Sequence, residues 1–342
     1  MTEMRTNDQL LAVNLLPVAV GADASVPALS HAPLVSVILL TCNRPTEASR
    51  SLRSILDQDY PNKEVIVVEN SSRGELRHLA QSAGENVQLV ELSENQGACA
   101  GRNAGLCQTR GEFLVTLDDD VVLDSPDSLS AVVRLLAGNP DLGAVAFWVG
   151  DPGTGKLSIR DWCHPRPYWT SSEQPFPTYY LTEGAMALRK QALDSAGLYD
   201  ERFFIAGEGH DLAMRILDRG FRILFSPEVR TWHYHSAQGR RPQRPYYFMT
   251  RNYLWIAFKD YPWPANIRFL LPKLAMMAWF ACRTGQLSPF VRGLVDGIRG
   301  LREIWATRTP VRPSTVRYLT EQDSLRPSYW ARLRRHHDSP LL

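Results

Sequence analysis

The 342-residue sequence has few cysteines and no long apolar run, and both absences narrow the class of protein. Its five cysteines are an odd number, widely scattered, without a Cys-x-x-Cys pair, so a reducing compartment is expected rather than a disulfide-stapled secreted fold. The longest apolar stretch, Phe269 to Cys282, contains Pro272 and Lys273 and is shorter than the ~20 residues that a membrane-spanning helix requires. A cytoplasmic protein is expected, located either in the cytosol or at the inner face of the membrane.

The chain as a whole also carries almost no net charge. The formal charge is only +2 and the mean hydropathy is slightly negative, which argues against a nucleic-acid partner. Arginine nevertheless concentrates in residues 283–335, which contain eleven arginines and four acids. This segment is expected to contact an anionic surface or to remain solvated.

Residues 1–33 are predicted to form a flexible N-terminal tail. The apolar segment Leu10 to Val20 resembles a signal peptide, but Asn14 and Pro17 interrupt it and the basic flank is missing. From residue 35 onward the chain alternates short Val, Ile and Leu-rich runs with segments of helical spacing, which indicates strands covered on both faces in an α/β sheet. The predicted strands are Val35 to Thr41, Glu64 to Glu69, Val87 to Glu91, Phe113 to Leu117, Gly143 to Val149, Glu183 to Arg189 and Val229 to His233.

Three consecutive acids, Asp118, Asp119 and Asp120, directly follow one predicted strand. Adjacent carboxylates at a strand end repel one another unless a cation or a set of donors neutralises them. Alternate residues point to the same side, so Asp118 and Asp120 are expected to approach one metal site while Asp119 points elsewhere. Carboxylate oxygens suit Mg²⁺ or Mn²⁺. A solvated acidic turn is the alternative.

Polar residues follow other predicted strands, at the edge where ligands of such sheets bind. These segments are Thr41-Cys42-Asn43-Arg44-Pro45, Glu69-Asn70, Asn95-Gln96-Gly97 and Arg102-Asn103-Ala104-Gly105. Together with the acidic triplet, and in this order over residues 35 to about 260, they resemble the motifs of the inverting glycosyltransferases of the GT-A fold, the large bacterial family 2 type.

The resemblance implies a GT-A-like α/β fold, a mostly parallel mixed sheet with helices on both faces, plus a C-terminal helical extension. It also implies a metal-dependent enzyme, with Mn²⁺ or Mg²⁺, that transfers a sugar with inversion from a nucleotide-diphosphate sugar (a UDP- or dTDP-sugar) to a hydroxyl of a carbohydrate, lipid-linked or small-molecule acceptor. The implied nucleotide-binding residues are Thr41, Asn43, Arg44, Glu69, Asn95, Gly97, Arg102, Asn103, Asp118 and Asp119. An acid such as Glu69 accepts hydrogen bonds from ribose or base, and Gly97 permits close approach of the backbone to a ligand.

A second group of polar residues spans Gly207 to Leu212 and contains Glu208, His210 and Asp211. The resembling enzymes carry an acid at the position of Gly209, where it acts as the general base. Inverting transfer needs a carboxylate or a histidine within reach of the acceptor hydroxyl. Glu208 is the first candidate for this role, Asp211 the second and His210 the third, with Asp211 at a helix start as its structural alternative.

A histidine after the last predicted strand completes the expected metal site. By resemblance His233, which follows Trp232, joins Asp118 and Asp120 as a ligand, and imidazole is a reasonable partner for manganese. His235 points the same way along the strand and stays an alternative ligand. Further on, Arg251-Asn252 matches another family feature, where basic side chains could meet the diphosphate.

The motifs divide the chain into a nucleotide-sugar-binding half (34–150), an acceptor-binding and catalytic half (151–260) and a helical, Arg-rich extension (261–342). The extension fits a peripheral membrane contact, helices packed on the catalytic domain, or a homodimer contact. Two rival functions remain. A nucleotide-sugar-binding protein without turnover is made credible by Gly209, and a nucleotidyltransferase would need a Gly-rich loop after the first strand, which the sequence lacks.

Overall fold

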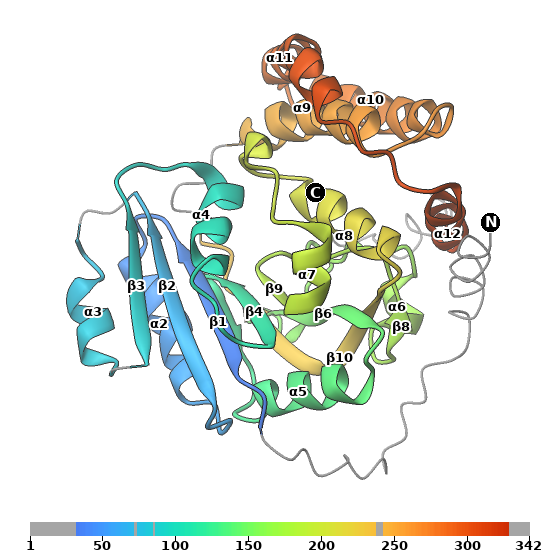
Figure 1. The fold of residues 1–342 in the computed structure, drawn as a ribbon. Helices are drawn as coiled ribbons and strands as arrows, with labels where there is room; N and C mark the ends of the chain where they lie inside the picture. The colour runs from blue at the N-terminus through green and yellow to red at the C-terminus, as the bar shows by residue number, and fades with distance from the viewer. Residues whose placement is uncertain (1–31, 72–73, 85, 237–241, 328–342) are drawn as a thin grey trace.

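The structure is a computed structural model that describes residues 32–71, 74–84, 86–236 and 242–327. Within these residues the chain forms a ten-stranded sheet with helices on both faces and a further layer of helices on one side (Figure 1). Of the tail predicted over residues 1–33, residues 1–31 lie outside the described part of the chain, and so does the end of the extension from residue 328.

Every strand predicted from the sequence is present. In chain order the strands are β1 (Val35–Thr41), β2 (Lys63–Asn70), β3 (Val87–Leu92), β4 (Phe113–Asp118), β5 (Val121–Leu123), β6 (Leu142–Asp151), β7 (Lys156–Leu157), β8 (Phe176–Pro177), β9 (Ala185–Arg189) and β10 (Arg222–His233). The largest difference is in β10, which begins seven positions before the predicted start at Val229. Its register shifts between Ser226 and Arg230, around Pro227, which has no N–H for the ladder.

The order of the strands creates a crevice at one edge of the sheet. The order is β3-β2-β1-β4-β9-β6-β10-β5, with β1 parallel to both β2 and β4 and with β9 antiparallel to β4 and β6. The chain runs outward from β1 to β3 and then returns to the other side of β1 as β4. Such a change of direction leaves a ligand-binding crevice beyond the carboxyl ends of β1 and β4.

Alternate residues of the strands face two hydrophobic cores. In β1, Ile38 and Leu40 belong to the core that includes α4, α7 and α8, while Val37 and Leu39 belong to the core that includes α2 and α5. The helices are α2 (Pro45–Leu56), α3 (Arg77–Ser82), α4 (Gly97–Leu106), α5 (Ser128–Gly138), α6 (Tyr168–Ser171), α7 (Lys190–Ala196), the short 3₁₀ helix η1 (Glu201–Phe203), α8 (Glu208–Asp218), α9 (Arg244–Lys259), α10 (Ala265–Arg283), α11 (Leu287–Ala306) and α12 (Pro313–Ser324).

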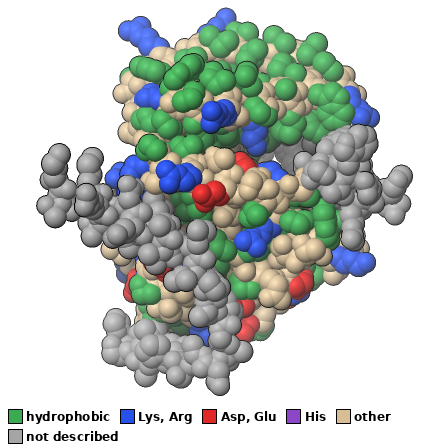
Figure 2. Space-filling model, turned by 90° about the vertical axis from the view of Figure 1, so that its right-hand side faces the viewer, with side chains coloured by type: hydrophobic (Ala, Val, Ile, Leu, Met, Phe, Trp, Pro, Cys, Tyr) green, Lys and Arg blue, Asp and Glu red, His purple; other side chains and the backbone are tan. Residues whose placement is uncertain are grey.

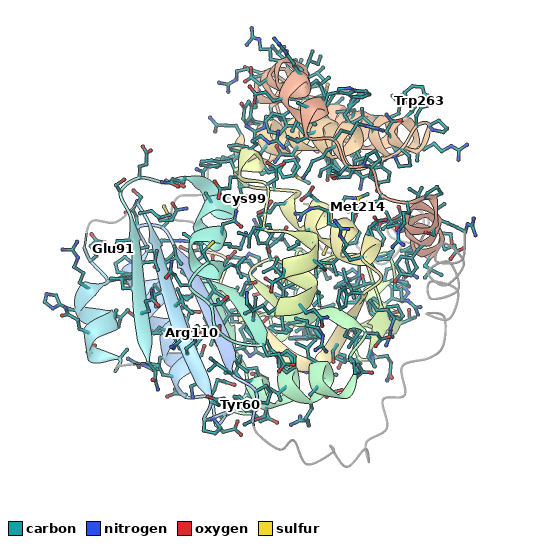
Figure 3. The ribbon with its side chains drawn as sticks, viewed as in Figure 1. Tyr60, Glu91, Cys99, Arg110, Met214 and Trp263 are labelled. Atoms are coloured by element: carbon teal, nitrogen blue, oxygen red, sulfur yellow. The ribbon has the colours of Figure 1, made fainter. Side chains whose placement is uncertain are left out.

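The C-terminal helices α9, α10 and α11 form a layer beside the sheet domain (Figure 1). Ile256 of α9 packs into the core that includes α8, and α11 crosses α9 so closely that a Cβ on Gly293 would lie 2.4 Å from the Tyr247 carbonyl oxygen. Trp263, between α9 and α10, is 71% exposed at the outer end of this layer (Figure 3). Among the described helices, none combines the length and the apolar character needed to cross a bilayer.

Candidate functional site

A cavity of about 990 Å³ opens at the carboxyl ends of β1, β2 and β4. Its walls come from the loops after these strands, the start of α4, the segment before α8 and the start of α9. Eight of the residues that the sequence analysis singled out line it: Thr41, Asn43, Arg44, Asn95, Gly97, Arg102, Asp118 and Asp120. The cavity therefore lies in the crevice that the strand order creates.

The three carboxylates of the acidic triplet have different surroundings. Asp118 and Asp120 line the cavity, whereas Asp119 is fully buried and accepts a 2.7 Å hydrogen bond from the Thr41 hydroxyl. Arg44 contacts Asp119 at 2.6 Å and Asp120 at 3.0 Å. Burial raises the pKa of Asp119 to about 7, against the opposing effect of the Arg44 guanidinium. In this structure Thr41 and Arg44 hold the Asp119 carboxylate inside the protein.

Arg102 connects the acidic triplet to the start of α8. It is 4% exposed and donates to Asp118 Oδ1 at 2.7 Å and to Glu208 Oε1 at 3.2 Å. One guanidinium therefore neutralises a carboxylate on the cavity wall and another beneath it, which keeps both in place.

His233, at the end of β10, lies between two carboxylates. Its Nε2 is 3.2 Å from Asp120 Oδ1 and its Nδ1 is 3.2 Å from Asp161 Oδ1, while His235 Nε2 is 2.9 Å from Asp161 Oδ2. Although burial alone would lower it, the pKa of His233 is raised to about 9 by hydrogen bonds to Asp120 and Asp161. Within the described residues, the group with metal-ligand spacing is Asp161, His233 and His235, whose ligand atoms lie within 4.8 Å of one another.

The predicted metal set of Asp118, Asp120 and His233 is not brought together as such a group in this structure. The reason is that Arg44 and His233 each occupy an oxygen of Asp120, while Arg102 holds Asp118. Asp161 was missed by the sequence analysis. It lies between short elements in the Pro and Trp-rich stretch before β8, where no spacing rule singles it out.

The three candidates for the general base do not line the cavity. Glu208 is 3% exposed and pairs with Arg102, and burial raises its pKa to about 7. Asp211 is fully buried and accepts from Arg215 and Lys259, which hold its pKa below the ordinary value despite burial.

His210 contacts the Tyr261 hydroxyl at 3.1 Å and stacks on Phe269, and burial lowers its pKa to about 3. In this structure both side chains serve the packing of α8 against α9 and α10.

Other predicted residues also serve the fold. Asn103 donates to the Tyr199 carbonyl and to Glu201, and so ties α4 to the loop before η1. Asn252 donates to three carbonyls of the segment before α8, and Arg251 to two carbonyls at η1. These amide and guanidinium groups are used by backbone oxygens rather than directed at the cavity.

Gly97 is required for a reason other than the one expected. It has φ +90°, and a Cβ there would lie 2.5 Å from the Phe204 carbonyl oxygen, which accepts from the Ala98 N–H at 2.6 Å. The close approach is thus to the protein's own backbone. Glu69 is buried at the end of β2, and the next residue, Asn70, lines the cavity in its place.

Two basic residues on the cavity wall, Arg160 and Arg244, were also missed. Arg160 is exposed in the loop after β7, and Arg244 begins α9. Neither follows a strand of the parallel half, so the search at strand ends could not find them. They add positive charge to the cavity wall.

The family described as glycosyl transferase family 2 matches residues 36–197, which run from β1 to α7. The matched segment is just under half of the 342-residue chain. The resemblance seen in the strand-end motifs is thereby confirmed. Helix α8 and His233 lie beyond the matched residues, and they are also where the sequence analysis fitted the structure least well.

Proteins from several bacteria and an archaeon resemble the chain in sequence. It is 27% identical over 268 residues to the O-antigen biosynthesis protein RfbC of Myxococcus xanthus, covering 72% of this chain and 20% of that protein. It is 26% identical to glycosyltransferase AglE of Haloferax volcanii, covering 64% and 69%, and 29% identical to the poly-beta-1,6-N-acetyl-D-glucosamine synthase of Staphylococcus epidermidis, covering 58% and 49%. The chain thus spans from a fifth to about two thirds of the length of these relatives.

Solved structures show the same fold at low sequence identity. The mannosyltransferase PcManGT of Pyrobaculum calidifontis, in complex with GDP-Man and Mn²⁺, superposes with a TM-score of 0.53 at 19% identity and 94% coverage of both chains. TarS of S. aureus, in complex with UDP-GlcNAc, gives 0.56 at 17% identity, covering 85% of this chain and 88% of that one. The predicted GT-A-like α/β fold with C-terminal helices is confirmed.

Proposed function

We propose that this protein is a metal-dependent, inverting glycosyltransferase that moves a sugar from a nucleotide-diphosphate sugar to an acceptor hydroxyl. The single observation that carries the proposal is the cavity at the change of strand direction. There two carboxylates, Asp118 and Asp120, face the same space as Arg44, Arg160 and Arg244. Carboxylates suit a divalent cation and guanidinium groups suit a diphosphate.

The donor side of the cavity fits a nucleotide diphosphate. Thr41, Asn43, Asn70 and Asn95 supply hydroxyl and amide groups at the ends of β1, β2 and β3, which can hydrogen-bond to ribose and base. A volume of about 990 Å³ is at the upper end of the range for small-molecule sites. Two solved neighbours were crystallised with GDP-Man and with UDP-GlcNAc, which supports a nucleotide sugar as the donor class, a UDP- or dTDP-sugar by the sequence motifs.

Carboxylates at the acidic end of the cavity suit a divalent cation, which would replace the contacts that guanidinium and imidazole groups make with Asp118 and Asp120 in this structure. Asp118 and Asp120 would hold it, with His233 as the imidazole partner, and this mixture of oxygen and nitrogen atoms suits Mn²⁺ better than Mg²⁺. When bound, the cation supplies positive charge to the diphosphate leaving group. Arg44 and His233 contact Asp120 in the described structure and neutralise it in the meantime.

Calorimetric titration with UDP tests the metal and the donor together. UDP should bind with Mn²⁺ present and lose most of its affinity in excess chelator, and Asp120→Ala should abolish the metal-dependent part. The exposed Asp194, paired with Lys190 on α7, gives a matched control, since Asp194→Ala should bind as the unchanged protein does. If Asp161→Ala lost the metal while Asp120→Ala kept it, the group formed with His235 would be the metal site. Equal UDP affinity with and without chelator would remove metal dependence.

A nucleotide-sugar-binding protein without turnover remains the second candidate. The observation in its favour is that Glu208 and Asp211, the acids expected to act as base, are buried away from the cavity. Release of nucleotide from a donor sugar in the presence of an acceptor panel would exclude it.

A membrane surface is the proposed partner of the C-terminal layer. Large apolar side chains are exposed on α10 and α11, among them Leu271, Trp279, Val291, Val295 and Ile298. Figure 2 shows hydrophobic side chains gathered over this layer, with Lys and Arg side chains around them. Apolar and aromatic side chains mixed with arginines are the composition of helices that lie in the interface of anionic bilayers. A second copy of the chain is the other occupant that the sequence predicted.

A further inference from the structure

The glycine at position 209 is explained by a neighbouring carboxylate. The Gly209 N–H, at the start of α8, donates to Glu183 Oε1 at 2.6 Å. A Cβ at position 209 would lie 2.2 Å from that same oxygen and 2.6 Å from the carboxyl carbon, so any side chain there requires the Glu183 carboxyl group to move. Gly209 is not among the residues with positive φ, so its backbone does not demand glycine. The Glu183 carboxyl fills the space that a side chain at 209 would take.

The structure holds Glu183 firmly beside the acidic end of the cavity. Its carbonyl accepts from the Thr116 hydroxyl at 2.6 Å, and the next carbonyl, of Gly184, accepts from the Asp118 N–H at 3.2 Å. A Cβ on Gly184 would lie 2.5 Å from the Asp118 carboxyl group. Glu183 thus directly precedes a residue that packs on an acid of the cavity wall.

Among the acids around the start of α8, Glu183 is partly exposed whereas Glu208 and Asp211 are buried, although none of the three is among the residues that line the cavity. Burial of its carboxyl group raises the pKa of Glu183, and the nearby Arg102 acts in the opposite direction. Glu208 pairs with Arg102 through Oε1, while its Oε2 is buried without a hydrogen-bond partner, and Asp211 pairs with Arg215 and Lys259. The Gly209 N–H, at the start of α8, donates to one oxygen of the Glu183 carboxylate. This hydrogen bond orients the carboxylate and leaves its other oxygen for a substrate.

We propose that Glu183 is the general base of the transfer, a role that rests on the proposed glycosyltransferase function. The acceptor hydroxyl oxygen attacks the anomeric carbon and forms the new glycosidic bond. The bond between that carbon and the diphosphate oxygen breaks, and its electron pair leaves with the diphosphate. The hydroxyl proton passes to the Glu183 carboxylate. Gly209 is then a positioning residue, since any side chain there would displace the base.

The test is a swap of the two positions. Nucleotide release is measured with a panel of UDP-, dTDP- and GDP-sugars, with water and with simple sugars as acceptors. Glu183→Gln should lower kcat by about 10²–10⁴-fold and leave UDP affinity by calorimetry within about threefold. Gly209→Ala should lower kcat in the unchanged background but have little further effect on Glu183→Ala. The double variant Glu183→Ala with Gly209→Asp returns a carboxylate to the same space and should recover at least about tenfold over Glu183→Ala.

Controls distinguish loss of the general base from unfolding of the variant and from absence of transferase activity. Thermal unfolding reports on each variant, and Glu183→Asp, which keeps the carboxylate, should retain part of the activity if Glu183→Gln proves unstable. Asp194→Asn is the surface control and should turn over normally. Turnover by folded Glu183→Gln at the unchanged rate overturns the base while leaving the transferase. A wild-type protein that binds none of the nucleotide sugars, or that binds one and never releases its nucleotide, overturns the proposed function and the base together.

Discussion

Replacing Asp211 with asparagine should destabilise the protein before it affects any chemistry. Asp211 is fully buried and pairs with Arg215 at 2.5 Å and with Lys259. Lys259 is itself 7% exposed at its side chain. Asparagine keeps one acceptor oxygen and removes the charge, so a buried ammonium and a largely buried guanidinium lose their counterion.

The expected cost follows from the two buried cations. Removing one partner of a buried ion pair costs about 3–5 kcal/mol, and the lower end applies because Lys259 also lies 3.2 Å from Asp200. With an unfolding entropy of about 2.1 cal/mol/K per residue, a chain of 342 residues should lose about 4–7 °C in Tm for that range.

Thermal unfolding at neutral pH measures the shift, with Asp194→Asn as the matched control. Asp194 forms an exposed i,i+4 pair with Lys190 at 3.1 Å, and such pairs contribute about 0.3–0.5 kcal/mol, so its Tm should change by less than about 1 °C. An Asp211→Asn protein that melted like the unchanged one but had lost turnover would refute this reasoning and return Asp211 to the list of candidate bases.

Two further outcomes are expected from other parts of the molecule. Burial, and then the nearby Arg326, lower the pKa of His164 to about 3, below its unfolded value of about 6.5. Titration of His164 therefore leaves the free energy of unfolding unaffected above about pH 6.5. As the pH falls from about 6.5 towards 3, this free energy decreases by about 1.4 kcal/mol per pH unit. His164→Asn should flatten the pH dependence of the free energy of unfolding, measured with denaturant. Vesicles rich in anionic lipid should sediment the protein, and Trp279→Ser with Ile298→Ser should reduce this binding; equal binding to neutral vesicles, or a dimer that persists without lipid, would contradict the membrane assignment.

The cavity wall that we propose for the nucleotide could be located from the sequence because its residues follow parallel strands. Carboxyl ends of parallel strands meet at one edge, so the order of Thr41, Asn95 and Asp118 along the chain was enough to bring them together. Buried ion pairs escaped this reasoning. Asp211 looks like a polar helix start until Lys259, 48 positions away, is placed against it, and the charged side chains that hold it are visible only in three dimensions.

The site also shows why the sequence does not reveal which residue replaces an acid that is missing from a motif. Gly209 by itself predicts loss of a base, since the sequence records only that a side chain is absent. Glu183 lies 26 positions earlier, before a different strand, and antiparallel pairing of β9 with β4 carries it to the start of α8. The glycine and the carboxylate fit together, because the Glu183 carboxyl group occupies the space that a side chain at position 209 would take. Loss of an acid at one position and gain of one at the other therefore have to be considered together when the activity of this protein is judged.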